Sequence, residues 1–418
     1  MLDYRPAEMS SRPTGYAWLV VGLLFVVALL NYLDRLILTT MRDPIRADIP
    51  MSDAHFGLLT SVFLWVYAAA SPLGGFLADR LGRRQVIIAS IFFWSAATFL
   101  TGLANSFHQM LIARALMGIS EACYIPAGLA LIADYHRGPT RSLATGIHMI
   151  GIYAGAALGG IGAVLAEHLG WRYGFRLFGG FGIAYSFVLL ACLRDAPSFL
   201  SGAQSESSAP RLVDVIGSAL STPAFAALLA VNFLVGVVNW AVYGWMPTFL
   251  KDRFHLSLGK AGLSATAYIQ VASFFGVLAA GVVADRWSRS SRRARALTPA
   301  IGFFLAGPCL FAAASSNLFA FTIAGLIVFG LGRGSIDANQ MPLVRQILPA
   351  HLSATGYGLL NLISTAAGGV MVYIGGALLD AHIDLSRIFQ VAGVGLVIAG
   401  LILVTIRPDL AEEVDSAG

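Results

Sequence analysis

The sequence GGFLADRLGRR occupies residues 74–84, and a degraded copy of it, AGVVADRWSR, occupies residues 280–289. Two further pairs keep the same order along the chain. GISEACYIP at 118–126 matches GSIDANQMP at 334–342, and SLATG at 142–146 matches LSATG at 352–356. A single match can arise by chance, but three matches in one order predict a chain built from two copies of one long unit.

Most of the chain is apolar. Of the 418 residues, 57% are hydrophobic and only 12% are charged, whereas an ordinary globular domain has about 25% charged residues. A helix needs about 20 largely apolar residues to cross a bilayer core. The sequence therefore predicts an all-α membrane protein with twelve transmembrane helices in two pseudo-symmetric six-helix bundles. The apolar runs are centred near residues 27, 67, 94, 121, 153, 183, 235, 272, 306, 331, 366 and 395.

A polar stretch separates the two sets of six spans. Residues 194–215 are rich in Ser, Pro and Ala, so we expect a linker between an N-terminal bundle, residues 1–193, and a C-terminal bundle, residues 216–418. Basic residues follow spans two, four and eight, whereas the loops after spans three and nine have none. By the positive-inside rule, we expect both termini and the linker to face the cytoplasm. The expected location is the plasma (inner) membrane.

These features resemble the major facilitator superfamily of secondary transporters, across essentially the whole chain. The family's loop signature, G-x-L-A-D-R-x-G-R-R, is complete from Gly75 to Arg84. The resemblance implies the major facilitator fold, with a substrate site between the bundles near the membrane midplane. A charge network at this loop suits a gate that holds one access state, and a basic loop that only sets topology is the alternative. The gating candidates are Asp79, Arg80, Arg83 and Arg84, with Asp285 and Arg286 in the degraded copy.

The sequence resembles two subfamilies of this superfamily. Residues 31–35, NYLDR, look like the N-Y-x-D-R pattern shared by the anion:cation symporters and the spinster-like transporters. Residues 121–126, EACYIP, resemble the symporters' E-A-x-x-x-P segment, whereas GISEACY at 118–124 is closer to the spinster pattern. The first resemblance implies a small organic anion as cargo, and the second implies lysophospholipid or another amphiphile.

Four charged side chains, Asp34, Arg35, Arg114 and Glu121, interrupt apolar spans. A charge at the centre of a transmembrane helix costs roughly 2.5–3.5 kcal/mol on insertion scales, so such charges usually pair or face water. Arg35 presents a planar cationic fork and is the first candidate for binding a carboxylate or phosphate, with Arg114 second. We expect Glu121 to take up the coupled proton, with Asp34 as its alternative. A permanent ion pair between Arg114 and Glu121, which share one helix face, is the structural alternative.

The second half offers amides and aromatic rings, which suit hydroxyl groups and sugar-like rings. Convergence of its asparagines on one cavity favours a small hydrophilic anion, whereas asparagines directed at neighbouring helices favour an amphiphile. Arg333 and Asp337 have the spacing of a same-face helix pair, which predicts a structural ion pair. The predicted substrate-binding residues of this half are Asn239, Trp240, Tyr243, Asn339 and Asn361, and Tyr32 is added from the first half.

Other functional classes lack their motifs. The only Gly-Lys, at Gly259, is followed by alanine, so the phosphate-binding loop of an ATP-driven pump is missing. TGYG at 355–358 resembles a potassium-channel filter, but its repeat partner, ATGI at 144–147, does not. Without an H-E-x-x-H motif or a nucleophile elbow, we expect no enzyme activity, no metal and no cofactor. The short basic clusters also argue against nucleic acid as a partner.

The sequence thus predicts a proton-coupled secondary active transporter, an alternating-access symporter of a small organic anion such as a sugar acid or carboxylate. The alternative is a spinster-like transporter of lysophospholipid or another amphiphile. The expected partners are the anionic substrate, protons and the lipid bilayer, and the expected oligomeric state is a monomer.

Overall fold

The computed structural model describes residues 15–136, 140–196, 217, 221–349 and 352–407, and their regular structure is helical. Twelve stretches are long and apolar enough to cross a membrane, and each predicted span centre falls within one of them. The all-α, twelve-span prediction is therefore confirmed. The helices are α1 (Gly15–Ile37), α2 (Arg42–Asp48), α3 (Asp53–Leu81), α4 (Arg83–Thr101), α5 (Phe107–Glu121), α6 (Tyr124–Tyr135), α7 (Arg141–Leu158), α8 (Ile161–Leu169), α9 (Trp171–Cys192), α12 (Pro223–Phe254), α13 (Leu258–Trp287), α14 (Ala294–Ser315), α15 (Phe319–Ile347), α16 (Ser353–Asp380) and α17 (Leu385–Thr405).

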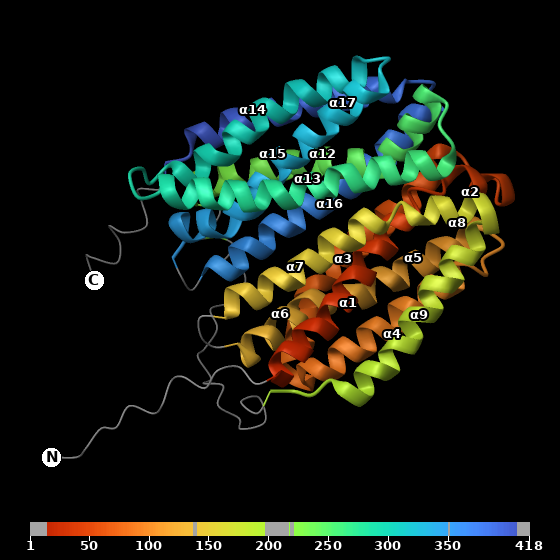
Figure 1. The fold of residues 1–418 in the computed structure, drawn as a ribbon, viewed down its shortest axis with the longest axis horizontal. Helices are drawn as coiled ribbons and strands as arrows, with labels where there is room; N and C mark the ends of the chain where they lie inside the picture. Colours follow the sequence, from red (N-terminus) through yellow and green to blue (C-terminus); the bar gives the residue numbers. More distant parts are fainter. Residues whose placement is uncertain (1–14, 137–139, 197–216, 218–220, 350–351, 408–418) are drawn as a thin grey trace.

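The helices form two bundles that lie side by side (Figure 1). The first contains α1 to α9 and the second contains α12 to α17. The bundles meet mainly where α3 packs on α16 and where α7 and α8 pack on α13. The predicted linker falls largely outside the described residues, so the boundaries at 193 and 216 stay a prediction.

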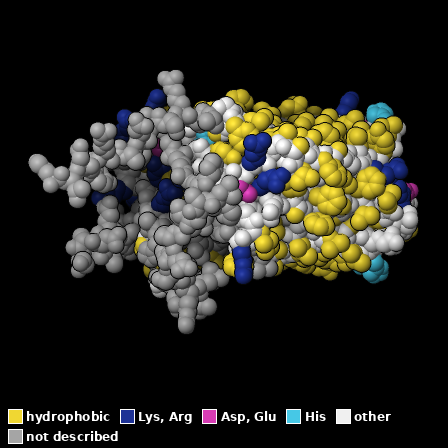
Figure 2. Space-filling model, turned by 90° about the horizontal axis from the view of Figure 1, so that it is seen from below, with side chains coloured by type: hydrophobic (Ala, Val, Ile, Leu, Met, Phe, Trp, Pro, Cys, Tyr) yellow, Lys and Arg dark blue, Asp and Glu magenta, His cyan; other side chains and the backbone are white. Residues whose placement is uncertain are grey.

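The two ends of the molecule differ. α1 begins and α17 ends at the same end, which we call the terminal end, and α2 lies at the opposite end, which we call the α2 end (Figure 1). Hydrophobic side chains cover most of the visible body between the ends, and Lys and Arg gather towards the ends (Figure 2). An apolar band between charged ends is the surface that a bilayer requires.

Two of the spans are interrupted where their sequence weakens the helix. The fourth span breaks between α5 and α6, immediately after Glu121. Pro126 has no N–H to bond the carbonyl of Ala122, which explains the break at that point. The fifth span breaks between α7 and α8 at Gly159 and Gly160, and the Cβ that Gly160 lacks would lie 2.6 Å from the carbonyl oxygen of Gly262 in α13. The first break leaves an acid at a helix end inside the first bundle.

Glycines on α7 allow it to pack closely against α1. A Cβ on Gly151 would lie 2.6 Å from the carbonyl oxygen of Phe25, and one on Gly159 would lie 2.7 Å from the Cβ of Leu36. Small residues at four-residue spacing let transmembrane backbones approach one another. This contact fixes α1, which carries Tyr32 and Arg35, against the span that faces the second bundle.

We predict that Gly151→Ala lowers the thermal stability of the purified protein in detergent. The new methyl group would press on backbone, which cannot move aside as a side chain can, and overpacking of this kind costs about 1–3 kcal/mol. Gly146→Ala on the same helix is the matched control, because nothing lies within 4 Å of its Cβ position. Equal melting temperatures for the two variants would show that the α1–α7 contact is looser than described.

Candidate functional site

A buried ion pair joins α1 to α5 in the first bundle. The Nε of Arg35 donates to Oε2 of Glu121 at 2.8 Å, and the side chains are 5% and 0% exposed. The guanidinium carbon of Arg35 also lies 4.3 Å from the ring centre of Tyr67 and 4.7 Å from that of Tyr32. Arg35 is therefore held by one acid and two aromatic faces.

This pair keeps unused hydrogen-bonding capacity. The Nη2 atom of Arg35, the Oε1 atom of Glu121 and both polar atoms of the Asn31 side chain are buried without a hydrogen-bond partner among the described residues. Buried polar atoms are almost always satisfied in stable cores, so each exception calls for a functional explanation. A cationic fork with an unused nitrogen is what an incoming anion requires.

Arg114 and Asp34 lie beside the pair but have other contacts. Arg114, 1% exposed, donates from Nη1 to the carbonyl oxygen of Asp34 at 3.4 Å and from Nε to that of Leu59 at 3.3 Å. The Asp34 carboxylate accepts from the hydroxyl of Thr98 at 3.4 Å. Glu121 therefore pairs with Arg35 and not with Arg114, and Arg114 ties α1 and α3 to α5.

A second charged cluster lies in the second bundle, around Arg333 of α15. Its Nη2 lies 3.4 Å from Oδ2 of Asp337, and its guanidinium carbon is 5.4 Å from the ring centre of Tyr243. The hydroxyl of Tyr153, from α7 of the first bundle, donates to the same Asp337 oxygen at 2.8 Å. The predicted pair between Arg333 and Asp337 is present, but its contact with the other bundle was not predicted.

The Arg333 cluster faces the first bundle. The ring centre of Tyr153 on α7 lies 5.8 Å from the guanidinium carbon of Arg333, and its hydroxyl bonds Asp337. Trp240 of α12 and Tyr32 of α1, whose ring lies against Arg35, both pack against one apolar cluster of the first bundle. The two clusters thus lie on either side of the contact between the bundles.

The other predicted binding residues divide into two groups. Trp240 packs edge-on against Tyr243, with ring centres 5.8 Å apart, and adjoins the Arg333 cluster. Asn239 is half-buried and Asn361 is exposed. Asn339 is fully buried and donates to the carbonyl oxygen of Ser335 in its own helix at 2.9 Å. The three asparagines therefore do not form one exposed set, because Asn339 bonds within α15.

The predicted gating residues make contacts within their own bundles. Arg83 pairs with Asp134 at 2.7 Å, and Asp285 pairs with Arg295 at 2.9 Å. Arg84 donates to the carbonyl oxygens of Leu190 and Leu193 at the end of α9, both at 2.6 Å. Arg80 and Arg286 are exposed, and the side chain of Asp79 lies outside the described residues.

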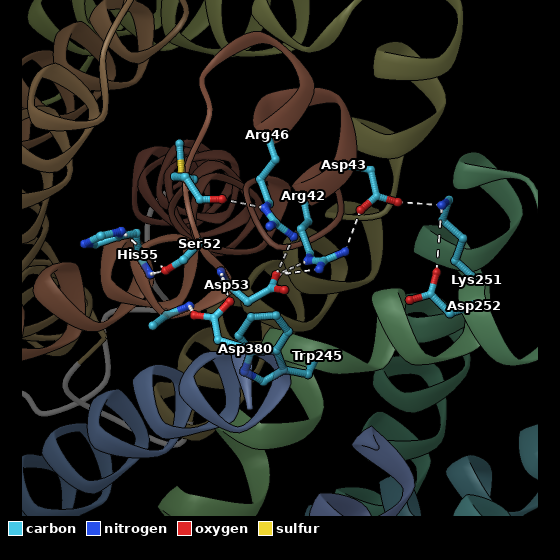
Figure 3. A network of polar contacts seen from close by, with 12 residues as sticks. Arg42, Asp43, Arg46, Ser52, Asp53, His55, Trp245, Lys251, Asp252 and Asp380 are labelled. Atoms are coloured by element: carbon cyan, nitrogen blue, oxygen red, sulfur yellow. Dashed lines mark hydrogen bonds and ion pairs between the residues drawn. The ribbon is translucent and has the colours of Figure 1, made fainter. Parts of the chain in front are cut away.

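Polar contacts at the α2 end join the two bundles (Figure 3). Asp43 lies between Arg42, at 2.7 Å, and Lys251 of the second bundle, at 2.5 Å. Asp380, at the end of α16, accepts the backbone N–H groups of Asp53 and Ala54 at 2.8 Å each. A carboxylate is favourable there because the first turn of α3 has unpaired N–H groups.

The distribution of ionic contacts distinguishes the two ends. Asp43 and Lys251 form an ion pair that joins the bundles at the α2 end. Among the gating candidates at the terminal end, Arg83 and Asp285 form ion pairs inside single bundles. An ion pair therefore holds the two bundles together at the α2 end.

The protein has two helical bundles, buried charges between them and an ion pair that joins them at one end. These features are those of a multi-pass membrane transporter of the secondary class. The chain belongs to the Major Facilitator Superfamily, whose model matches residues 24–298 and 265–417. This membership confirms the predicted family and supports transport as the role of the protein.

Known proteins with similar sequences include a D-galactonate transporter and a spinster homologue. The D-galactonate transporter of Escherichia coli O6:H1 is 25% identical over 413 residues, covering 93% of this chain and 95% of that protein. Protein spinster homolog 1 of Xenopus tropicalis is 26% identical, covering 70% of this chain and 59% of that protein. A bacterial homologue of the human lysosomal transporter Spinster, solved inward-facing and unoccupied, superposes with a TM-score of 0.73 at 22% identity, covering 95% and 96% of the two chains.

We predict that removing Lys251 loosens the α2 end. Partial burial acts to raise the pKa of Asp43, but the hydrogen bond from Lys251 and the charge of Arg42 outweigh it and hold this pKa below its usual value. Asp43 therefore stays ionised at neutral pH, and its contribution is lost only as the pH falls through that lowered pKa. Lys251→Met should speed maleimide labelling of a cysteine at the buried Thr39, in a chain whose three native cysteines are replaced.

The ratio of labelling rates between Lys251→Met and its parent should stay constant from pH 8 to pH 5. Arg253→Met, which removes an exposed charge two residues further along, is the matched control and should label like the parent. If both substitutions speed labelling alike, the Asp43–Lys251 pair does not fasten the bundles.

Proposed function

We propose that this protein is a proton-coupled symporter of a small organic anion such as a sugar acid or another carboxylate. The observation that carries the proposal is the buried pair of Arg35 and Glu121, in which the arginine has an unpaired nitrogen beside aromatic faces. The similarity to a D-galactonate transporter supports the same substrate class.

Arg35 is the proposed anion-binding residue. A guanidinium stays protonated and presents parallel N–H donors that match a carboxylate. Tyr32 and Tyr67 lie against its face, so its donor edge is held in a fixed direction. The same tyrosine rings offer apolar faces and hydroxyl groups to a polyhydroxylated chain.

Glu121 is the proposed proton carrier, because it competes with the substrate for Arg35. An arginine that leaves Glu121 for an anion would leave a buried carboxylate unpaired, and breaking a buried pair in this way costs about 3–5 kcal/mol. Protonation of Glu121 removes that cost. Proton uptake and anion binding thus favour each other, which is the thermodynamic condition for symport.

The fastened α2 end supports an alternating-access cycle for this substrate. Asp43, Lys251 and Asp380 close that end, so the site exchanges with the terminal end in this state. The terminal end carries the arginine-rich loops, including Arg84 and Arg286, and is therefore the proposed cytoplasmic side. In this orientation, both termini are cytoplasmic in a plasma or inner membrane.

An amphiphile is the second candidate substrate. A groove of about 580 Å³ runs along the outer face of the first bundle, between α3, α4 and α5. Its lining is almost entirely apolar and includes Leu77, Phe93 and Leu116, which suits an acyl chain. The similarity to spinster homolog 1 fits the same alternative.

We predict that a sugar acid raises the melting temperature of the purified wild-type protein. A ligand at 100 times its Kd stabilises the folded state by about 2.7 kcal/mol. Arg35→Ala should abolish this rise, and Arg35→Lys, which keeps the charge but not the fork, should weaken it. Arg345→Ala, which removes an exposed charge from α15, should respond like the wild type. Stabilisation by a lysophospholipid alone, or an unchanged response of Arg35→Ala, would support the amphiphile instead.

We predict that Glu121→Gln separates anion movement from proton movement. Glutamine has the shape of the protonated acid, so Arg35 remains available to the anion while no proton is exchanged. In proteoliposomes, anion exchange should persist but a pH gradient should no longer drive accumulation. Asp252→Asn neutralises an exposed acid and serves as the control. Accumulation by Glu121→Gln would assign the proton to another group.

A further inference from the structure

Arg333 is held more loosely than Arg35. Its Nη1 lies 3.4 Å from both the Gln270 amide oxygen and the Ser273 hydroxyl, and its Nη2 lies 3.4 Å from Asp337. These distances are at the long limit for N–H···O bonds, whereas Arg35 and Glu121 are 2.8 Å apart. The Nε of Arg333 is buried without a partner among the described residues. The guanidinium thus has one unpartnered donor, and its other contacts are long.

Unpaired polar atoms surround this guanidinium. The hydroxyl oxygen of Tyr243 and Nε2 of Gln270 are buried without a partner among the described residues, and their side chains are 8% and 2% exposed. Both residues are close to Arg333. A cation with an unpartnered amide N–H and hydroxyl nearby offers donors for anionic oxygen atoms.

Arg333 and Arg35 face the same space from different bundles. Tyr32 stacks on Arg35, and Tyr243 lies against Arg333. Trp240 lies edge-on to Tyr243, and Trp240 and Tyr32 both pack against one apolar cluster of the first bundle. A ligand that reaches from one arginine to the other therefore contacts both bundles.

We propose that the transported substrate is a dianion, such as a dicarboxylate, whose two charged ends bind Arg35 in the first bundle and Arg333 in the second. This inference rests on the proposed function and specifies its substrate class. A monoanion would leave one of the two arginines with its unused donors unpaired.

The acids of the two clusters match this assignment. Each arginine has one acidic neighbour, Glu121 for Arg35 and Asp337 for Arg333. An anionic end that takes the place of each acid would leave one cation for each end of the ligand. Asp337 contacts Arg333 on its own helix and the Tyr153 hydroxyl on α7.

Binding at Arg333 also acts on a contact between the bundles. The Tyr153 hydroxyl donates to the oxygen of Asp337 that faces Arg333. A ligand carboxylate on Arg333 replaces Asp337 there and changes the charge that holds Tyr153. A dianion therefore changes the hydrogen bond between Tyr153 on α7 and Asp337 on α15. A monoanion on Arg35 does not reach this hydrogen bond.

The test compares an aldonate, with one carboxylate, and the aldarate of the same sugar, with two. Binding of each to the purified full-length protein is measured by titration calorimetry. Charge-assisted hydrogen bonds of an arginine correspond to about 10- to 100-fold in affinity. We expect the wild type to bind the aldarate tighter by such a factor, and Arg333→Gln to lose this preference while its aldonate affinity stays within about threefold.

Further variants separate the possible outcomes. Arg35→Gln should lose both ligands, Arg333→Lys should keep part of the preference, and Arg345→Gln should match the wild type. Equal affinities in the wild type, or an equal loss of both ligands in Arg333→Gln and Arg333→Lys, would overturn the dianion assignment while the anion symporter stands. If neither carboxylate binds the wild type, the proposed function itself fails.

Discussion

The energy of a charge inside a membrane protein is the constraint on which this structure depends. Arg35 and Glu121 are nearly inaccessible, and each would be costly to bury alone. Their pairing requires α1 and the end of α5 to meet, and the break after Glu121 places the acid at that end. The glycine contact between α1 and α7 holds the arginine in place from the other side. The helix packing of the first bundle thus brings together the two charges on which the chemistry of the site depends.

The α2 end follows a different physical rule, because its charges are near water. The contacts of Asp43 with Arg42 and Lys251 involve side chains that are 14–33% exposed. Pairs of that kind contribute little each, so they can form and break during a transport cycle without a large barrier. The carboxylate of Asp380, in the second bundle, also accepts a hydrogen bond from the first turn of α3 in the first bundle. Buried charge pairs lie in the centre of the protein, and partly exposed ones lie at its end.

The sequence predicted the spans because apolar length is a local property, and it predicted the four charges of the first bundle because charge stands out in an apolar run. It named Arg114 as the possible ion-pair partner of Glu121, whereas the partner is Arg35, because the pairing depends on how α1, α3 and α5 pack. It also assigned Arg333 only to Asp337, four residues away on the same helix. The charge of Arg333 in the middle of a span was the signal that could have placed it in the site. The α2-end contacts come from the short helix α2 and from the ends of longer helices, where no periodic pattern marks a partner in the other bundle.

The internal repeat explains why two acids face the bundle interface. Glu121 and Asp337 occupy equivalent positions in GISEACYIP and GSIDANQMP. Their arginines are not equivalent, because one comes from a neighbouring helix and the other from the same helix, at the position that corresponds to Met117. In the first bundle, the sulfur of Met117 accepts a hydrogen bond from Arg114, so that position already faces a buried cation. Matching acids with arginines from non-matching positions give each bundle its own charge pair. It also lets the two pairs differ in strength, at 2.8 and 3.4 Å, so that one can open before the other.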